Sequence, residues 1–194
     1  MLNNSNIFLK KKILIYGLGK SGLSALKFLK RDNEITTYDD KLKIKNKKFI
    51  KKKFDCIIIS PGIDINKCSL SKFLKDNNKS IFTDLDIFYS HYKKNNKITI
   101  TGTNGKSTTA KILYEVLKDQ KIDVRLVGNI GNPILLEKNI TSRTVFVIEA
   151  SSYQLEYSKL FRSNISLILN ISSDHLDRHK TINKYVNAKF KLVK

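Results

Sequence analysis

Residues Ile98–Thr109 read ITITGTNGKSTT, a β-rich run followed directly by a glycine loop. The loop has the form G-x-x-G-K-S, two residues shorter than the common G-x-x-x-x-G-K-[ST] phosphate loop. Its backbone N–H groups can still surround a phosphate, Lys106 can reach the β and γ phosphates, and the Ser107 hydroxyl can ligate Mg²⁺. We therefore predict a nucleotide-phosphate site made of Gly102, Thr103, Asn104, Gly105, Lys106, Ser107 and Thr108. The alternative, a glycine turn with an incidental lysine, leaves the preceding strand and the following amphipathic helix unexplained.

Outward from this loop, short β-rich runs alternate with segments of helical period, which is typical of βαβ units and parallel sheets. We expect strands at residues 13–16, 35–38, 56–59, 98–101, 124–127, 145–148 and 166–169. We expect helices at residues 23–29, 70–74, 106–117 and from 182 onward. The polar run His91–Lys97 is the best linker. The predicted α/β chain has a Rossmann-like parallel-sheet domain at 1–93 and an incomplete P-loop ATPase-like α/β domain at 94–194.

A second glycine loop, Gly17–Gly22 (GLGKSG), lies between the first predicted strand and helix and satisfies G-x-G-x-x-G. Asp39 and Asp40 end the next strand, about 20 residues downstream, where an acid would bind a ribose. Gly62 lies in a turn after the third strand, at the sheet edge where ligands of open α/β sheets bind, although by itself this segment is equally consistent with a plain turn. These features predict a diphosphate nucleotide on the first sheet. The alternative is that the glycines serve only helix–strand packing.

Polar groups also follow strands of the second half. The apolar strand 145–148 ends in Glu149, which would be costly to bury unless it binds a cation. After the next strand come Asp174 and His175, for which we favour a metal or phosphate role. His175 and His179 have the spacing of a zinc protease pair, but Leu176 stands where that motif needs glutamate. We interpret His179 and His91 as surface residues.

Composition narrows the class of protein. The net charge is +20, but only 5 of the 37 basic residues are arginine, and the lysines accompany abundant asparagine and isoleucine, as codon bias in an AT-rich genome produces. We therefore expect no nucleic-acid partner, although a basic protein that associates with nucleic acid stays an alternative. The densest basic run, residues 41–53, reads as a solvated helix face with Ile44, Phe49 and Ile50 turned inward. Cys56 and Cys68 form no disulfide or zinc pattern, so we expect a reducing cytoplasm. No apolar run approaches the length of a membrane span. We also expect a monomer.

In this order the motifs resemble the Mur ligases of peptidoglycan synthesis, in particular the D-glutamate-adding (MurD) branch. The resemblance runs from Lys12 to the last residue. Its most specific segments are TGTNGKST (101–108), GNIG (128–131), EASSYQLE (149–156) and LNISSDHLDRH (169–179). The aromatic-Gln-Leu-Glu after the double serine favours the D-glutamate-adding branch over the branches that add L-alanine, diaminopimelate or D-alanyl-D-alanine.

The resemblance implies UDP rather than NAD on the first glycine loop. The implied substrate-binding residues are Lys20, Ser21, Asp39, Asp40, Gly62, Asn129 and His175. The second loop would hold ATP, with Ser107 and Glu149 on Mg²⁺. Lys189 falls at the family's carbamylated lysine, which with His175 would ligate a second Mg²⁺. The alternative interpretation of Lys189 is a surface lysine on an amphipathic helix.

The implied reaction transfers phosphate from ATP to the L-alanyl carboxylate of UDP-N-acetylmuramoyl-L-alanine, and the amine of D-glutamate then displaces the phosphate. Lys106, His175 and Lys189 are the implied catalytic residues. The family continues beyond such a lysine-bearing helix, so we expect this chain to be incomplete, to catalyse little alone, and to have a frayed helix around Lys189. A non-catalytic nucleotide-sugar-binding fragment is therefore the main alternative function.

Overall fold

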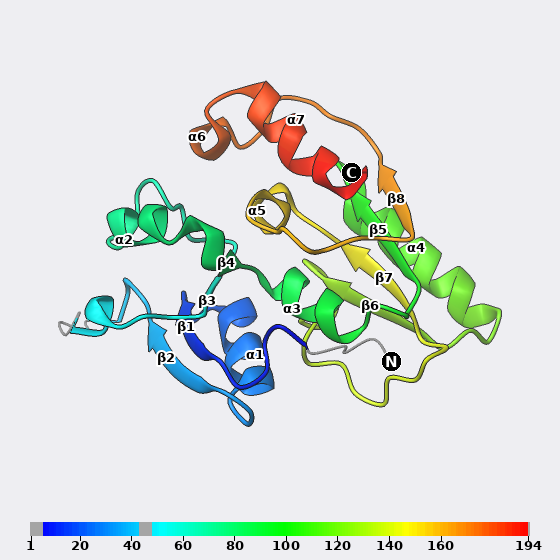
Figure 1. The fold of residues 1–194 in the computed structure, drawn as a ribbon. Helices are drawn as coiled ribbons and strands as arrows, with labels where there is room; N and C mark the ends of the chain where they lie inside the picture. The colour runs from blue at the N-terminus through cyan, green and yellow to red at the C-terminus, as the bar shows by residue number, and fades with distance from the viewer. Residues whose placement is uncertain (1–5, 43–47, 194) are drawn as a thin grey trace.

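The computed structural model describes residues 6–42 and 48–193, and their strands form two four-stranded sheets (Figure 1). The first sheet has the order β2-β1-β3-β4, from β1 (Lys12–Tyr16), β2 (Glu34–Tyr38), β3 (Cys56–Ile59) and β4 (Ile81–Phe82). The second has the order β6-β7-β5-β8, from β5 (Lys97–Thr101), β6 (Val124–Gly128), β7 (Val145–Glu149) and β8 (Ile165–Ile168). Every strand pairing in these sheets is parallel. The predicted α/β class is confirmed.

Helices cover both faces of each sheet. In the first half they are α1 (Lys20–Leu29), α2 (Ser71–Asp76) and α3 (Asp84–His91), with 3-10 turns η1 (Lys48–Lys51) and η2 (Asn78–Ser80). In the second half they are α4 (Lys106–Asp119), α5 (Ser152–Glu156), α6 (Leu176–His179) and α7 (Ile182–Phe190), with the 3-10 turn η3 (Lys191–Val193). Because both faces are covered, a central strand such as β3 (CIII) is a continuous apolar run that is buried throughout.

The alternation of side chains along β7 shows how the second sheet is covered. Val147 packs on the α4 side with Ile100 and Ala110, whereas Phe146 and Ile148 pack on the other side with Leu155 of α5. All seven predicted strands and four predicted helices are present, with ends shifted by a few residues. The strand β4 and the helices α3 and α6 were not predicted, and the start of α5 was expected after Glu149 without bounds. Two residues are too few to show a strand period, and α3 carries acids among its apolar residues.

The two halves share a hydrophobic core across α3. The Phe88 ring of α3 meets the Phe146 ring of β7 edge to face, with centroids 4.8 Å apart. The predicted boundary at 93/94 falls between α3 and β5 and stays a prediction, because the core crosses it.

Asp86 of α3 forms a second, polar connection between the halves. Its carboxylate is fully buried. One oxygen accepts hydrogen bonds from the backbone N–H and the hydroxyl of Thr83, the N-cap residue of α3. The other accepts the Ser158 hydroxyl at 2.8 Å and the backbone N–H groups of residues 159, 160 and 161 at 2.9, 2.7 and 3.2 Å. One side chain therefore satisfies a run of buried donors that belong to the other half.

Replacing Asp86 with alanine should lower the free energy of unfolding by about 3 kcal/mol, because several buried donors lose their acceptor together. Urea unfolding of the chain followed by circular dichroism measures the loss. The matched control is Asp32→Ala, whose 44% exposed carboxylate pairs with Arg31 at 3.5 Å and should change stability by less than about 0.5 kcal/mol. Equal losses in the two variants would contradict the role given to Asp86.

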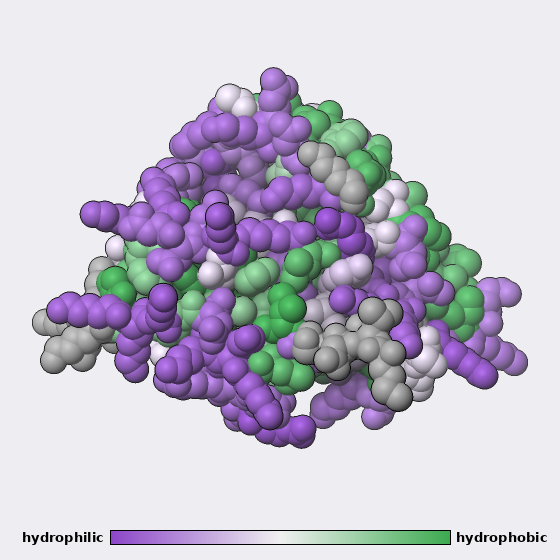
Figure 2. Space-filling model, viewed as in Figure 1, coloured by the Kyte–Doolittle hydropathy of each residue, from purple (hydrophilic) through white to green (hydrophobic). Residues whose placement is uncertain are grey.

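The face of the molecule shown in Figure 2 is dominated by polar and charged side chains. Apolar residues gather over β8 and α4, where Ile165, Leu167, Ile112 and Val116 are exposed. In the basic run 41–53, Ile44 lies outside the described residues. The Phe49 ring packs against the Tyr38 ring, with the two centroids 5.2 Å apart. Among the described residues, no helix is long and apolar enough to cross a bilayer.

Candidate active site

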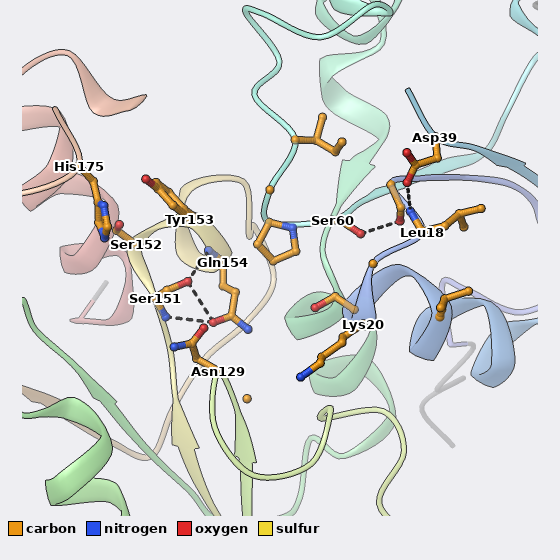
Figure 3. A pocket seen from close by; sticks show the side chains of 18 of the residues that line it. Leu18, Lys20, Asp39, Ser60, Asn129, Ser151, Ser152, Tyr153, Gln154 and His175 are labelled. Atoms are coloured by element: carbon orange, nitrogen blue, oxygen red, sulfur yellow. Dashed lines mark hydrogen bonds between the residues drawn. The ribbon is translucent and has the colours of Figure 1, made fainter. Parts of the chain in front are cut away.

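A cavity of about 1140 Å³ lies where the carboxyl ends of the strands of both sheets meet. Segments following β1, β2 and β3 line it from the first half, and segments following β5, β6 and β7 line it from the second (Figure 3). Ten of the predicted site residues line this cavity: Lys20, Ser21, Asp39, Asp40, Gly62, Gly102, Lys106, Asn129, His175 and Lys189. The two glycine loops, more than 80 positions apart in the sequence, therefore face one space.

The first glycine loop is tightly packed beneath the cavity. A Cβ on Gly22 would lie 1.8 Å from the Gly17 carbonyl oxygen, so only glycine permits this approach of α1 to the loop. Gly17 itself has a φ of +90° and accepts a hydrogen bond from Ser60 at 2.7 Å. These glycines therefore do serve helix–loop packing, and the loop that they form also lines the cavity.

The two acids after β2 brace the loop. The Asp39 carboxylate accepts the Leu18 N–H at 2.6 Å and the Lys41 N–H at 2.8 Å (Figure 3). The Asp40 carboxylate accepts the Tyr16 hydroxyl at 2.6 Å and also binds Ser69. Both acids line the cavity as predicted, but they are engaged by the protein's own donors.

The second glycine loop starts α4, with Gly105 at the N-cap and a φ of +79°. The N–H groups of Thr103 and Asn104 donate to Asn170 at 3.0 and 2.9 Å, which ties the loop to the segment after β8. The N–H groups of the first turn of α4 have no acceptor within the helix and are directed along its axis. The Lys106 ammonium folds back onto the Thr103 carbonyl at 2.6 Å. Ser107 and Thr108 line a neighbouring groove beside α4.

Glu149 at the end of β7 is buried behind the second loop. One carboxylate oxygen accepts the Ser107 hydroxyl at 2.8 Å, and the other accepts the Asn129 amide at 2.8 Å. Ser107 and Glu149, predicted as joint metal ligands, are therefore in direct contact. A serine hydroxyl beside a carboxylate supplies the hard oxygen donors that Mg²⁺ prefers.

An aromatic wall formed by Tyr153, His175, His179 and Tyr185 bounds the cavity on the side of the second half. The His175 side chain lies near Tyr153 (Figure 3), and the two ring centroids are 4.8 Å apart. The Nε2 atom of His175 is 3.4 Å from Asp174. The prediction of a surface position for His179 is wrong. It is 3% exposed, stacks on Tyr153 and bonds the Ser152 hydroxyl at 3.0 Å, and burial lowers its pKa.

His91 also departs from the prediction of a surface residue. Its ring is half-buried, and its Nε2 atom lies 2.7 Å from the Asn6 amide. Burial lowers the pKa of this imidazole. His91 lies on α3 and does not line the cavity.

The alternative interpretation of Lys189 as a surface lysine is wrong, and so is the expectation of a frayed helix around it. The helix α7 is formed and packs Tyr185, Ala188 and Lys189 inward. The Lys189 ammonium is buried, donates to the Gly102 carbonyl at 2.8 Å and lies 4.5 Å from the centre of the Tyr185 ring. Burial, with a contribution from the positive charge of Lys106, lowers its pKa to about 8.

Several cavity residues were not assigned from the sequence. Ser60 follows β3, and Ser151, Tyr153 and Gln154 follow β7, where a capping box of Ser151 and Gln154 starts α5. The signal that could have found them is their place after strands whose carboxyl ends meet at one sheet edge. Arg178, which contacts the cavity lining through Ile63, lies in the family-like segment 169–179 but was given no role from the sequence.

Comparison with known proteins agrees with this arrangement. A family described as the Mur ligase middle domain matches residues 100–194. The chain is 37% identical over 94% of its length to a UDP-N-acetylmuramoylalanine–D-glutamate ligase of Rickettsia bellii, covering 43% of that protein. It is 34% identical over 94% of its length to the same-named ligase of Caldicellulosiruptor saccharolyticus, covering 45% of it. The chain thus spans less than half the length of these curated relatives.

Two solved structures share the fold. One is the UDP-N-acetylmuramate:L-alanyl-γ-D-glutamyl-meso-diaminopimelate ligase of Neisseria meningitides, with a TM-score of 0.58 and 16% identity over 95% of this chain and 68% of that one. The other is the UDP-N-acetylmuramate–alanine ligase of Thermotoga maritima, with a TM-score of 0.51 and 20% identity over 92% of this chain and 46% of that one. With the middle-domain match and the relatives above, the chain belongs to the Mur ligase family.

Proposed function

We propose that this chain supplies the UDP-sugar site and the ATP-phosphate site of a ligase that adds D-glutamate to UDP-N-acetylmuramoyl-L-alanine. One observation carries the proposal: a single cavity is lined by both glycine loops. A long ligand whose diphosphate lies on the first loop can extend towards the second loop within this cavity. The 37% identity to a ligase named for this substrate pair supports D-glutamate as the added amino acid.

The proposed chemistry has two steps. The alanyl carboxylate oxygen of the substrate attacks the γ phosphorus of ATP, forming an acyl phosphate and releasing ADP. The amine of D-glutamate then attacks the acyl carbon, phosphate leaves, and the nitrogen loses a proton to give the amide. Positive charge near the transferred phosphoryl group stabilises both transition states.

Residues of this chain have distinct tasks in that scheme. The N-terminus of α4 and the loop Gly102–Thr108 bind the phosphates, and Lys106 exchanges the Thr103 carbonyl for a phosphate oxygen. Lys20 and Ser21 at the start of α1 bind the substrate diphosphate. Asp39 holds the first loop in shape through the Leu18 N–H.

Ser107 and Glu149 fit a Mg²⁺ ion, because a hydroxyl and a buried carboxylate are already in contact and the second carboxylate oxygen is oriented by Asn129. When bound, Mg²⁺ would offset phosphate charge during transfer. The second proposed ion would use His175 and Lys189. As an ammonium, Lys189 cannot ligate a cation, so this ion requires the carbamylated form, a carboxylate. Within the described residues there is no cluster of three or more His, Cys, Asp or Glu side chains that could replace it.

Binding measurements on the 194-residue chain test the proposal. By calorimetry, UDP-N-acetylmuramoyl-L-alanine and Mg²⁺-ATP should both bind, and UDP-N-acetylglucosamine, which lacks the lactyl-alanine arm, should bind more weakly than the muramoyl ligand. Binding of neither ligand would contradict both proposed sites. Binding of the nucleotide sugar without phosphate release, in the chain and in the full-length gene product alike, would favour the alternative of a non-catalytic nucleotide-sugar-binding protein.

A further inference from the structure

Arg178 in the short helix α6 is a buried cation that joins the two halves of the molecule. Its side chain is 7% exposed. The Nη2 atom donates to the Ile63 carbonyl in the first half at 2.7 Å, and Nε donates to the Glu156 carboxylate of α5 at 2.9 Å. The guanidinium also lies over the Tyr153 and Tyr157 rings, 5.2 and 5.4 Å from their centres. Ile63 and Arg178 are 115 positions apart in the sequence.

Two of the partners of Arg178, Ile63 and Tyr153, line the cavity. Ile63 and its neighbour Gly62 line the cavity from the first half, and Tyr153 lines it from the second. The Tyr153 ring also lies next to the His175 ring, with the two ring centroids 4.8 Å apart. The backbone N–H of Arg178 donates to the His175 carbonyl at 3.1 Å, closing the turn of α6. One guanidinium thus holds together the aromatic wall and the turn after β3.

The helix α6 cannot hold this geometry alone. It has four residues, and a helix of that length does not sustain itself in water. Both flanking residues, His175 and Lys180, have left-handed backbones with φ of 54° and 67°, which cost energy unless the surroundings impose them. A planar, doubly hydrogen-bonded, stacked arginine is the kind of anchor that imposes such a position, and a lysine lacks its fork geometry.

We propose that Arg178 is a positioning residue that sets the spacing between the first-half turn at Ile63 and the Tyr153–His175 wall. A ligand that spans the cavity then meets both sides in the correct relative position. The ligand part of this inference rests on the proposed function. The positional part concerns the free chain and does not depend on any ligand.

Nuclear magnetic resonance of the free chain tests the positional part. The chain has three histidines, so the ring-proton spectrum is simple. Arg178→Met should shift the His175 and His179 ring resonances, because the Tyr153 ring on which both depend loses its anchor. His91, on α3, is the internal control and should not shift. Unchanged His175 and His179 resonances would overturn the inference.

Calorimetry tests the consequence for binding. Arg178→Met should raise the Kd of UDP-N-acetylmuramoyl-L-alanine about tenfold, because preorganisation of the second wall is lost. The Kd of UDP alone, which reaches only the first glycine loop, should change less than about twofold. General destabilisation would weaken both ligands alike. Equal effects on the two ligands would therefore overturn the positioning role.

Two further variants separate positioning from folding. Glu156→Gln with Arg178→Met removes both charges, so it leaves no unpaired buried charge if the single variant folds poorly. Arg162→Met is the matched control, since Arg162 bonds the Phe161 and Lys159 carbonyls of its own segment and does not line the cavity. If the unmodified chain fails to bind the muramoyl ligand, the proposed function fails, while the resonance shifts still decide the role of Arg178.

Discussion

Alanine at position 106 is expected to lower ATP-dependent amide formation about 10³-fold, because the transferred phosphoryl group loses the positive charge that the glycine loop supplies. In the structure the Lys106 ammonium bonds the Thr103 carbonyl on the rim of the cavity. It is therefore available to a phosphate without breaking the fold. The reaction is followed in the full-length gene product by phosphate release and by chromatography of the amide product.

Lys118→Ala is the matched control for this prediction. Lys118 lies on the same helix, α4, its side chain is exposed, and it lines neither the cavity nor the groove beside α4. Its loss should change the rate less than about twofold, since surface substitutions away from a site have small effects. Undiminished turnover in Lys106→Ala would exclude the proposed phosphate site. A fall in melting temperature matching the fall in rate would point to a folding defect instead.

Replacing Lys189 with alanine is expected to lower ligation at least about 10²-fold in the full-length gene product, provided that its carbamate serves as a carboxylate ligand. The burial that lowers the pKa of Lys189 to about 8 leaves part of the side chain as neutral amine near neutral pH. Neutral amine is the form that adds CO₂. The structure thus favours the chemistry that the modification requires at this position.

Rescue distinguishes this role from a structural one. A small carboxylate such as acetate should restore part of the activity of Lys189→Ala, because it can enter the space left by the side chain and replace the carbamate. Lys184→Ala on the same helix, at an exposed position, is the control and should neither lose activity nor respond to acetate. Loss of activity without any rescue would show that the Gly102 hydrogen bond alone matters.

Local patterns carried most of the fold prediction. A strand running into a glycine loop and a helix is encoded within about 20 residues, so both loops were found from spacing alone. Gly22 and Gly105 illustrate why: one allows a close backbone approach, and the other adopts a left-handed φ of +79°. The strand β4 was not predicted because its two residues are too few to show the alternating pattern of a strand. The helix α3 was not predicted because Asp86, an acidic residue that is fully buried, interrupts the apolar pattern expected of the buried side of a helix.

The site was predicted less completely than the fold. The structure brings Ser107 and Glu149 into contact, because the loop after β5 and the end of β7 lie at the same sheet edge, while their joint binding of Mg²⁺ stays a prediction. His179 was misplaced because its burial comes from Tyr153 and Ser152, which belong to another helix. Lys189 was singled out only through the family resemblance, because composition and spacing do not distinguish it among 37 basic residues, and its burial required the tertiary structure.

The sequence by itself determined the α/β class, the two glycine loops and the polar residues at strand ends, since these depend on backbone rules that act over a few residues. Only the tertiary structure decided that both loops face one cavity, that Lys189 is buried on Gly102, and that Arg178 reaches Ile63. These contacts join positions 87 and 115 residues apart. Burial, charge pairing and the pKa of a side chain depend on such distant neighbours, and no local pattern records them.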